Sequence, residues 1–409
     1  MTVNNIVSER QYRLSQRLAQ LEPSATASMS GKVAQLRAQG INVISFSIGE
    51  PDFDTPAPIK AAAVAALERN HTHYTPTGGI ADLRRAVAQR ASSDNGVDYT
   101  INQVTVTTGA KEALYFAFQA LCDAGDEVII PTPYWVSYVE QVRLAGAKPV
   151  LIQTTEATGF KITADQLAVH LTPRTRAVIL NSPSNPTGAV YSAEELRAIA
   201  DVLRDTDVIV ISDEIYDAIC YVDYARWLRV APEFADRTLV INGASKAYAM
   251  TGWRIGYVAG PGPILEAIKA IQSHSTTHPA SIAQYAALVA FSPSEEIDQS
   301  VAAMAKAFHA RRDLILSILA TIPGVAYTVP DGAFYVFPNV SGLLNRPLAD
   351  GVTCATCQDL MNYLLDRAHI GVVSGDAFGA PGYLRLSYAT GNDDIVEGMR
   401  RFADAVRLS

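Results

Sequence analysis

One lysine and one arginine, eight positions apart, form the most chemically suggestive pattern in the chain. Lys246 follows the strand-like run 237–241, and Arg254 lies between two glycines in Gly252-Trp253-Arg254-Ile255-Gly256. A lysine amine becomes a nucleophile toward an aldehyde when burial or a nearby cation lowers its pKa. An arginine a short loop away can bind a phosphate and supply that positive field. The pair suggests a Schiff base between Lys246 and pyridoxal phosphate (PLP), although a single loop lysine is more often an ordinary surface residue.

Two further segments place polar side chains directly after short apolar runs. Asn185-Pro186-Thr187-Gly188 comes soon after the run 177–180, and Ser212-Asp213-Glu214-Ile215-Tyr216 follows the run 208–211. In open α/β sheets, ligands bind beyond the carboxyl ends of the strands. A carboxylate such as Asp213 can keep the pyridine nitrogen of PLP protonated, which makes the ring an electron sink, and Asn185 and Tyr216 can donate to the ring oxygen. Taken singly, the first segment could equally be a plain turn and Asp213 a helix cap.

The order of these motifs along the chain resembles that of the class I/II aminotransferases of PLP fold type I. The pattern Asn-Pro-x-Gly, Ser-Asp-Glu-Ile-Tyr, Ser-Lys and Gly-Trp-Arg-x-Gly is most similar to the bacterial aspartate/prephenate aminotransferase branch. The similarity extends from Pro23 to Ala389. It implies PLP as cofactor, an L-amino acid and a 2-oxo acid as substrates, and a homodimer with shared active sites. It also implies that Lys246, Asp213 and Tyr216 are the catalytic residues, with Lys246 moving the α-proton of the substrate.

The resemblance assigns further residues to the cofactor. The segment Gly109-Ala110-Lys111 lies where a strand turns into a helix. Free N–H groups and the helix dipole favour a phosphate at such a place. In the family, this turn and the arginine at the Arg254 position together hold the PLP phosphate. Trp135 is expected to stack on the pyridine ring. Tyr74 is expected to reach the phosphate bound by the neighbouring subunit, so a monomer should be inactive. Gly243 stands where many relatives have a phosphate-binding serine, so one phosphate contact is expected to be missing.

The same resemblance implies how the substrate is held. Arg385 corresponds to the arginine that clamps the α-carboxylate, a task suited to a planar guanidinium. The backbone of Gly49 is expected to lie opposite Arg385 and to let the substrate approach closely. Trp135 and Asn185 are expected to contact the substrate as well as the cofactor.

Recognition of the substrate side chain depends on the residues around a Pro-Ser-x-Thr motif. In this branch the hydroxyls of the motif, here Ser24 and Thr26, and a lysine at the Lys111 position bind a distal carboxylate. Their presence favours aspartate or glutamate as substrate. Members of the branch that use prephenate typically carry a basic residue where this chain has Glu22, so we expect prephenate to be disfavoured. The ranking of aspartate, alanine, aromatic and other donors stays open at this point.

The elements that position these residues predict an α/β fold. Apolar runs alternate with helical patterns between residues 104 and 259, which indicates a mostly parallel sheet of the seven-stranded type with helices on both faces. Residues 293–321 are expected to form one long helix, followed by strands at 332–337 and 383–388 and a final helix over 393–408. We therefore expect a large PLP-binding domain at 51–292, and a smaller α+β domain formed by residues 1–50 together with residues 293–409, because the N-terminal part alone cannot bury a core.

Composition excludes several other classes of protein. The 409 residues carry a formal net charge of −8 without a basic run, which argues against nucleic-acid binding. No apolar stretch has the length of a membrane span and no secretory signal begins the chain, so a cytoplasmic protein is expected. Cys354 and Cys357 have CxxC spacing, but no second ligand pair for a metal and no thioredoxin-like context accompany them. His71 and His73 lack a third ligand, and no metal site is expected.

Three rival interpretations share these motifs, and only the first of them stays open. A PLP lyase or an aminocyclopropane-carboxylate-type synthase would share the cofactor residues and differ only in the substrate pocket. A PLP-binding transcription regulator would carry a helix-turn-helix domain, for which the residues before Pro23 leave no room. A noncatalytic relative would be expected to lack Lys246 or Asp213.

Overall fold

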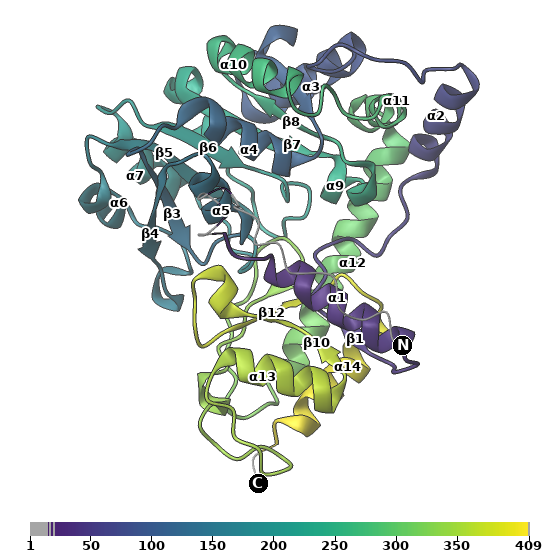
Figure 1. The fold of residues 1–409 in the computed structure, drawn as a ribbon, viewed down its shortest axis with the longest axis vertical. Coiled ribbons are helices and arrows are strands. Elements are labelled where there is room, and N and C mark those ends of the chain that lie inside the picture. The colour runs from purple at the N-terminus through teal and green to yellow at the C-terminus, as the bar shows by residue number, and fades with distance from the viewer. Residues whose placement is uncertain (1–14, 16–17, 19–20, 408–409) are drawn as a thin grey trace, which may run out of the picture.

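The computed structural model describes residues 15, 18 and 21–407. Figure 1 shows a larger upper part built around a sheet and a smaller lower part, with the long helix α12 (Glu295–Leu319) running between them. The outer limits of the expected domains, residues 1 and 409, lie outside the described residues, and so does residue 408, the expected end of the last helix. None of the helices in the described ranges is long and apolar enough to span a membrane.

The larger part contains a seven-stranded sheet in the order β2-β8-β7-β6-β5-β3-β4. Neighbouring strands are parallel except at β8, which is antiparallel to both β7 and β2. The expected mostly parallel sheet is thus confirmed. Its strands are β2 (Val104–Thr107), β3 (Glu127–Thr132), β4 (Lys148–Gln153), β5 (Thr175–Asn181), β6 (Ile209–Asp213), β7 (Thr238–Gly243) and β8 (Gly256–Ala259).

Helices cover both faces of this sheet because its strands are apolar on both sides. Along β5, Val178 and Leu180 point into one core, whereas Ala177 and Ile179 point into the other. This alternation follows from the period of two in a strand. The first core is closed by α2 (Ala57–Glu68), α3 (Ala81–Asn95), α6 (Ala164–His170), α7 (Ala193–Leu203), α8 (Trp227–Val230) and α11 (Ser281–Phe291), and the second by α4 (Ala110–Leu121), α5 (Ser137–Leu144) and α10 (Gly262–Ser273).

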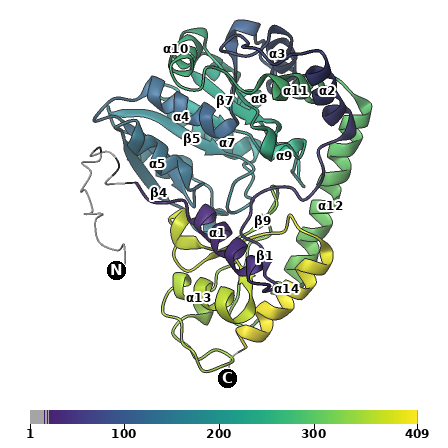
Figure 2. The same cartoon turned by 45° about the vertical axis from the view of Figure 1, so that its right-hand side comes forward.

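The smaller part combines residues 25–45 with residues 335–405, which lie side by side in both views (Figure 2). Strand β1 (Ile44–Ser45) pairs in parallel with β10 (Ile370–Gly371), and β9 (Tyr335–Val336), β12 (Leu384–Ser387) and β11 (Val373–Ser374) form an antiparallel sheet. Met29, Phe46, Phe308 and Phe402 share one core. Helices α1 (Ala25–Ala38), α13 (Cys357–Tyr363) and α14 (Asn392–Ala405) complete this part.

One strand is shorter than the sequence pattern predicts. The strand expected over 332–337 is reduced to β9, which begins only at Tyr335 because Ala333 adopts a positive φ of 56° that interrupts an extended run. Helix α4 ends at Leu121, since Cys122 is already extended. Helix α7 begins with a capping box, in which Ser192 Oγ accepts from Glu195 N at 3.2 Å.

Candidate active site

The carboxyl ends of three adjacent parallel strands bring the expected residues together. Asn185 follows β5, Asp213 ends β6, and Lys246 lies in the short helix α9 (Ala244–Ala247) directly after β7. These residues line a cavity of about 390 Å³, called here the inner cavity. Nine further residues singled out from the sequence also line it: Ser24, Thr26, Gly49, Ala110, Lys111, Trp135, Tyr216, Arg254 and Arg385.

Lys246 presents a buried amine to the inner cavity. Its Nζ donates to the carbonyl oxygen of Gly49, which belongs to the segment after β1. Burial lowers the pKa of Lys246 to about 7; the charges of Arg385 and Arg254 act in the same direction and Glu50 opposes them. A neutral amine is therefore available near neutral pH, as a nucleophile or general base requires.

Asp213 is a buried carboxyl group that pairs with no cationic side chain among the described residues. Its Oδ2 accepts a hydrogen bond of 2.6 Å from Tyr138 Oη, and its Oδ1 accepts one of 3.3 Å from Ile215 N. Burial raises the pKa of Asp213 to about 6, although the hydrogen bond from Tyr138 opposes this shift. A cationic group bound next to Asp213 would be strongly favoured, because a buried charge is costly unless it is paired.

The N-terminus of α4 and the guanidinium of Arg254 form an anion-binding corner. Gly109 precedes α4 with φ of 78°, and a Cβ at this position would collide with the Arg254 side chain. Glycine is therefore required here on two counts. Arg254 Nη1 donates to Thr251 O at 2.8 Å and Nη2 donates to Thr108 O at 3.4 Å. A guanidinium has five N–H donors, so others are left for a ligand. The first N–H groups of α4 have no acceptor within the helix and carry its positive dipole end.

Arg385 is a guanidinium buried in the inner cavity. Only 2% of the residue is exposed, and it makes no ion pair with a carboxylate among the described residues. Nη1 donates to Asn185 Oδ1 at 3.0 Å and Nη2 to Ser47 O at 2.6 Å, while Nε has no hydrogen-bond partner in the part of the chain that the structure describes. Burial lowers the pKa of Arg385. An isolated buried cation with a free donor is suited to bind an anionic ligand.

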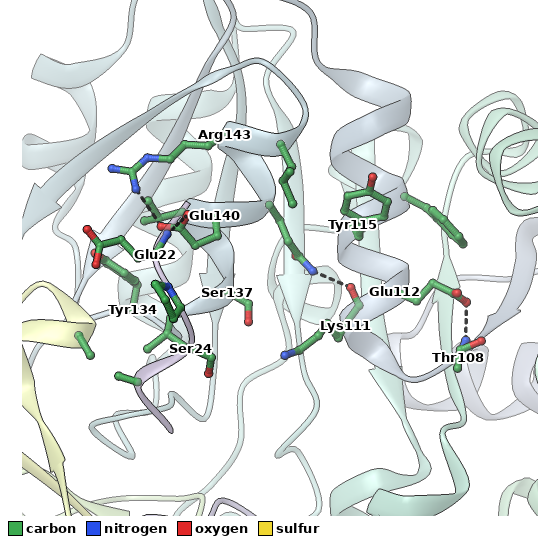
Figure 3. Close-up of a pocket in the computed structure, with 18 of the residues that line it drawn as sticks. Glu22, Ser24, Thr108, Lys111, Glu112, Tyr115, Tyr134, Ser137, Glu140 and Arg143 are labelled. Carbon is green, nitrogen blue, oxygen red and sulfur yellow. Dashed lines mark hydrogen bonds and ion pairs between the residues drawn. The ribbon is translucent and has the colours of Figure 1, made fainter. Parts of the chain in front are cut away.

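A second, larger pocket of about 850 Å³ adjoins the inner cavity and is called here the outer pocket. Both are lined by Ser24, Lys111 and Arg254, but the outer pocket contains neither Lys246 nor Asp213, so the reactive groups lie in the smaller space. Figure 3 shows the side chains of Ser24 and Lys111 pointing toward a common space. The ammonium of Lys111 lies 4.9 Å from the ring centroid of Trp135.

The N-terminal segment enters the outer pocket through Glu22. Its backbone N donates to Glu140 Oε2 at 3.2 Å, while Glu140 Oε1 accepts from Arg143 at 2.8 Å (Figure 3). Ser24 caps α1, because its Oγ accepts from Ala27 N at 3.4 Å. The hydroxyl proton of Ser24 is not used by this cap and can still be donated to a ligand.

Tyr74 does not reach the inner cavity of its own chain. The residue is 90% exposed and packs edge-to-face on His278, with ring centroids 5.7 Å apart.

Cys354 and Cys357 are both buried, and among the described residues no group of three or more His, Cys, Asp or Glu side chains could hold a metal ion.

Two tyrosines of the site carry no signal in the sequence motifs. Tyr138 binds Asp213 from the first turn of α5. Trp135 precedes this helix, and its ring packs edge-to-face on that of Tyr138 with centroids 5.4 Å apart. Tyr335 lies on β9, and its Oη is 2.7 Å from Tyr216 Oη. The short distance from Trp135 along the chain could have pointed to Tyr138, whereas the contact of Tyr335 depends on how the smaller part packs against the larger one.

Comparisons with known proteins agree with this arrangement. A family model described as aminotransferase class I and II matches residues 41–405. An aspartate aminotransferase of Geobacillus stearothermophilus is 47% identical, over 96% of this chain and 99% of the relative. An aspartate/prephenate aminotransferase of Cereibacter sphaeroides is 46% identical, over 95% of this chain and 97% of the relative.

Solved structures show the same fold. The crystal structure of the aspartate aminotransferase from Rhizobium meliloti superimposes with a TM-score of 0.92 at 41% identity, covering 97% of this chain and all of the other. The aspartate aminotransferase from Thermus thermophilus with maleate gives a TM-score of 0.90 at 41% identity, covering 96% of this chain and 99% of the other. The chain belongs to the class I and II aminotransferase family.

Proposed function

We propose that this aminotransferase uses PLP to move the amino group of an L-amino acid, aspartate in the first place, to a 2-oxo acid such as 2-oxoglutarate, by a ping-pong mechanism. The observation that carries the proposal is the meeting of three buried groups in the inner cavity. Lys246 supplies an amine with a pKa of about 7. Asp213 supplies a carboxyl group that pairs with no cationic side chain among the described residues, and Arg385 supplies a guanidinium that pairs with no carboxylate among them.

The donors and acceptors of the inner cavity fit the functional groups of PLP. Lys246 fits the aldehyde and Asp213 the ring nitrogen, while Arg254 and the N-terminus of α4 at Ala110 and Lys111 fit the phosphate. Asn185 fits the ring oxygen as a donor, because its Oδ1 already accepts from Arg385 and its amide nitrogen is left to donate. Tyr216 is a second donor to that oxygen, and Trp135 offers an indole that can cover the ring.

The residues of the chain then have distinct tasks. When bound, PLP supplies an electron sink for the negative charge that develops at the substrate α-carbon. Asp213 holds the proton on the ring nitrogen. Lys246 Nζ would take the proton from the substrate α-carbon as general base and deliver it as general acid to C4′, the cofactor carbon that carried the aldehyde. Arg385 orients the substrate through its α-carboxylate, while the backbone of Gly49 lines the opposite side.

Aspartate is the preferred donor because a distal carboxylate would meet one positive charge and two hydroxyl groups. Lys111, Ser24 and Thr26 line the inner cavity, and Lys111 and Ser24 also line the outer pocket. Relatives at 46–47% identity are named for aspartate, and one solved neighbour was crystallised with maleate, a dicarboxylate. The Cereibacter relative is named for prephenate as well, but here the carboxylate of Glu22 in the outer pocket would repel the ring carboxylate of prephenate.

The proposal includes a homodimer in the cytoplasm, with Tyr74 completing the site of the partner subunit. The exposed ring of Tyr74, which lines neither the inner cavity nor the outer pocket of its own chain, supports this assignment. We propose the same division into residues 1–50, 51–292 and 293–409 as above. The separate hydrophobic cores of the two parts support it.

A half-reaction screen tests the function directly. The PLP-loaded protein is mixed with single amino acids, and conversion of the bound cofactor from its aldehyde to its amine form is followed by absorbance. Aspartate and glutamate should convert it fastest, and addition of 2-oxoglutarate should restore the original spectrum. Release of an elimination product without formation of the amine form would instead favour the lyase or synthase alternative, and fast reversal by prephenate would contradict the role of Glu22.

A further inference from the structure

Tyr335 is a buried tyrosine of the inner cavity to which the mechanism above gives no task. Its hydroxyl lies 2.7 Å from that of Tyr216, and the two rings pack edge-to-face with centroids 5.7 Å apart. Tyr335 is 1% exposed and Tyr216 4%. Among the described residues, Tyr216 is the only hydrogen-bond partner of the Tyr335 hydroxyl.

Tyr335 also touches both residues expected to hold the substrate carboxylate. The guanidinium of Arg385 lies 4.6 Å from the centroid of the Tyr335 ring. The Tyr335 hydroxyl occupies the space beside Gly49, where a Cβ would collide with it. Tyr335 comes from β9 in the smaller part, whereas Tyr216 follows β6 of the large sheet. The hydroxyl pair therefore connects the substrate-holding side of the cavity to the cofactor-holding side.

The number of protons decides which hydroxyl donates once a cofactor is present. A tyrosine hydroxyl has one proton to donate and lone pairs with which to accept. If Tyr216 gives its proton to the ring oxygen of PLP, the 2.7 Å contact remains a hydrogen bond only when Tyr335 donates to Tyr216. A hydroxyl that accepts a hydrogen bond becomes a stronger donor, because hydrogen bonds in a chain polarise one another.

We propose that Tyr335 is a positioning residue, whose hydroxyl donates to Tyr216 and thereby orients and strengthens the hydrogen bond from Tyr216 to the ring oxygen of the bound cofactor. This inference rests on the proposed PLP chemistry. The bond from Tyr216 stabilises negative charge on the ring oxygen, which makes a proton on the nitrogen joining Lys246 to the cofactor less favourable. Loss of the Tyr335 hydroxyl should therefore raise the pH at which that nitrogen loses its proton.

The charged groups around the pair are left in place by removal of this one oxygen. Asp213 ends β6, Lys246 Nζ lies 5.7 Å from the Tyr216 ring centroid, and Arg385 lies over the Tyr335 ring from β12. The substitution Tyr335→Phe keeps the ring under Arg385 and removes only the hydroxyl. Tyr388→Phe is a matched control, because Tyr388 is equally buried but its hydroxyl binds Ala333 O at 3.3 Å, outside the inner cavity.

The test is a pH titration of the absorption spectrum of the PLP-loaded protein. We expect Tyr216→Phe to raise the midpoint by about one to two pH units, the value of a hydrogen bond to a charged group. Tyr335→Phe should raise it by about 0.1 to 0.6 unit, the share expected from cooperative strengthening of roughly 10–30%. Because Tyr335 acts through Tyr216, adding Tyr335→Phe to the Tyr216→Phe variant should produce no further shift. Tyr388→Phe should leave the midpoint unchanged.

Two results would overturn the inference alone. One is a Tyr335→Phe midpoint that matches the unmodified protein and the Tyr388→Phe control. The other is an equal shift from Tyr335→Phe with and without the Tyr216 hydroxyl, which would indicate a general structural effect. If the unmodified protein showed no pH-dependent PLP spectrum at all, the proposed cofactor chemistry would be refuted, and the inference with it.

Discussion

Replacement of Lys111 by methionine should separate aspartate from alanine as substrates. The variant keeps most of the aliphatic stem beside Trp135 and removes the ammonium, which lies 4.9 Å from the indole centroid. Alanine lacks a distal carboxylate, so its reaction depends on Arg385 and the cofactor but not on the Lys111 charge. The loss should therefore fall on kcat/KM for aspartate.

The size of the loss follows from the environment of Lys111. A charge-assisted hydrogen bond contributes about 1.5–3 kcal/mol, which corresponds to a factor of roughly ten to a hundred. Lys111 is partly exposed in the outer pocket, where water weakens the interaction. We therefore expect the aspartate-to-alanine ratio of kcat/KM to fall by a factor near the lower end of this range, with Lys111→Arg retaining part of the preference.

Steady-state kinetics with both donors and a PLP-binding measurement on the same variant make the test decisive. Lys111 also belongs to the first turn of α4, where burial and the nearby charge of Arg254 lower the pKa of Lys111. Lys111 could therefore bind the cofactor phosphate instead of the substrate. In that case aspartate and alanine would lose activity equally, and PLP affinity would fall. Such a result would refute the proposed recognition of the distal carboxylate. Lys148→Met, on the edge strand β4, controls for general loss of a lysine.

Two further predictions concern the catalytic groups. Asp213→Ala should lower kcat/KM for aspartate, because the protonated ring nitrogen would lose its buried partner. The expected loss of transition-state stabilisation is about 3–5 kcal/mol. Near-normal turnover would show that Asp213 is only a structural carboxylate held by Tyr138. The rate at which cofactor-free protein takes up PLP should rise with pH and level off above about 7, since only the neutral Lys246 amine attacks the aldehyde and burial lowers its pKa to about 7. A stopped-flow series would contradict this pKa if the rate still rose tenfold per pH unit above pH 9, as for a lysine with its ordinary value of 10.5.

The positions of Asn185, Asp213 and Lys246 could be predicted from the sequence because each follows an apolar run of a parallel sheet. Parallel strands end at a common edge, so side chains far apart in the sequence meet there. The same logic predicted the mostly parallel sheet itself. It did not predict that β8 is antiparallel to both neighbours, since strand direction leaves no mark in a four-residue apolar run.

Contacts between the two parts of the molecule could not be predicted in this way. The pairing of Tyr335 with Tyr216 and the bond from Lys246 to Gly49 O join segments more than 100 residues apart through packing of the smaller part. The outer pocket has the same origin, because Glu22 reaches Glu140 only after the N-terminal segment has folded over α5. Local patterns also missed the positive φ of Ala333, which shortens β9.

The most direct test of the account is to identify the lysine that binds PLP. The PLP-loaded protein is reduced with borohydride, digested and mapped by mass spectrometry, with Lys246→Ala as the control. We expect a single modified peptide, the one that contains Lys246. The Lys246→Ala variant should still bind PLP noncovalently but should perform no multiple turnovers. Modification of another lysine, or sustained turnover by Lys246→Ala, would contradict it.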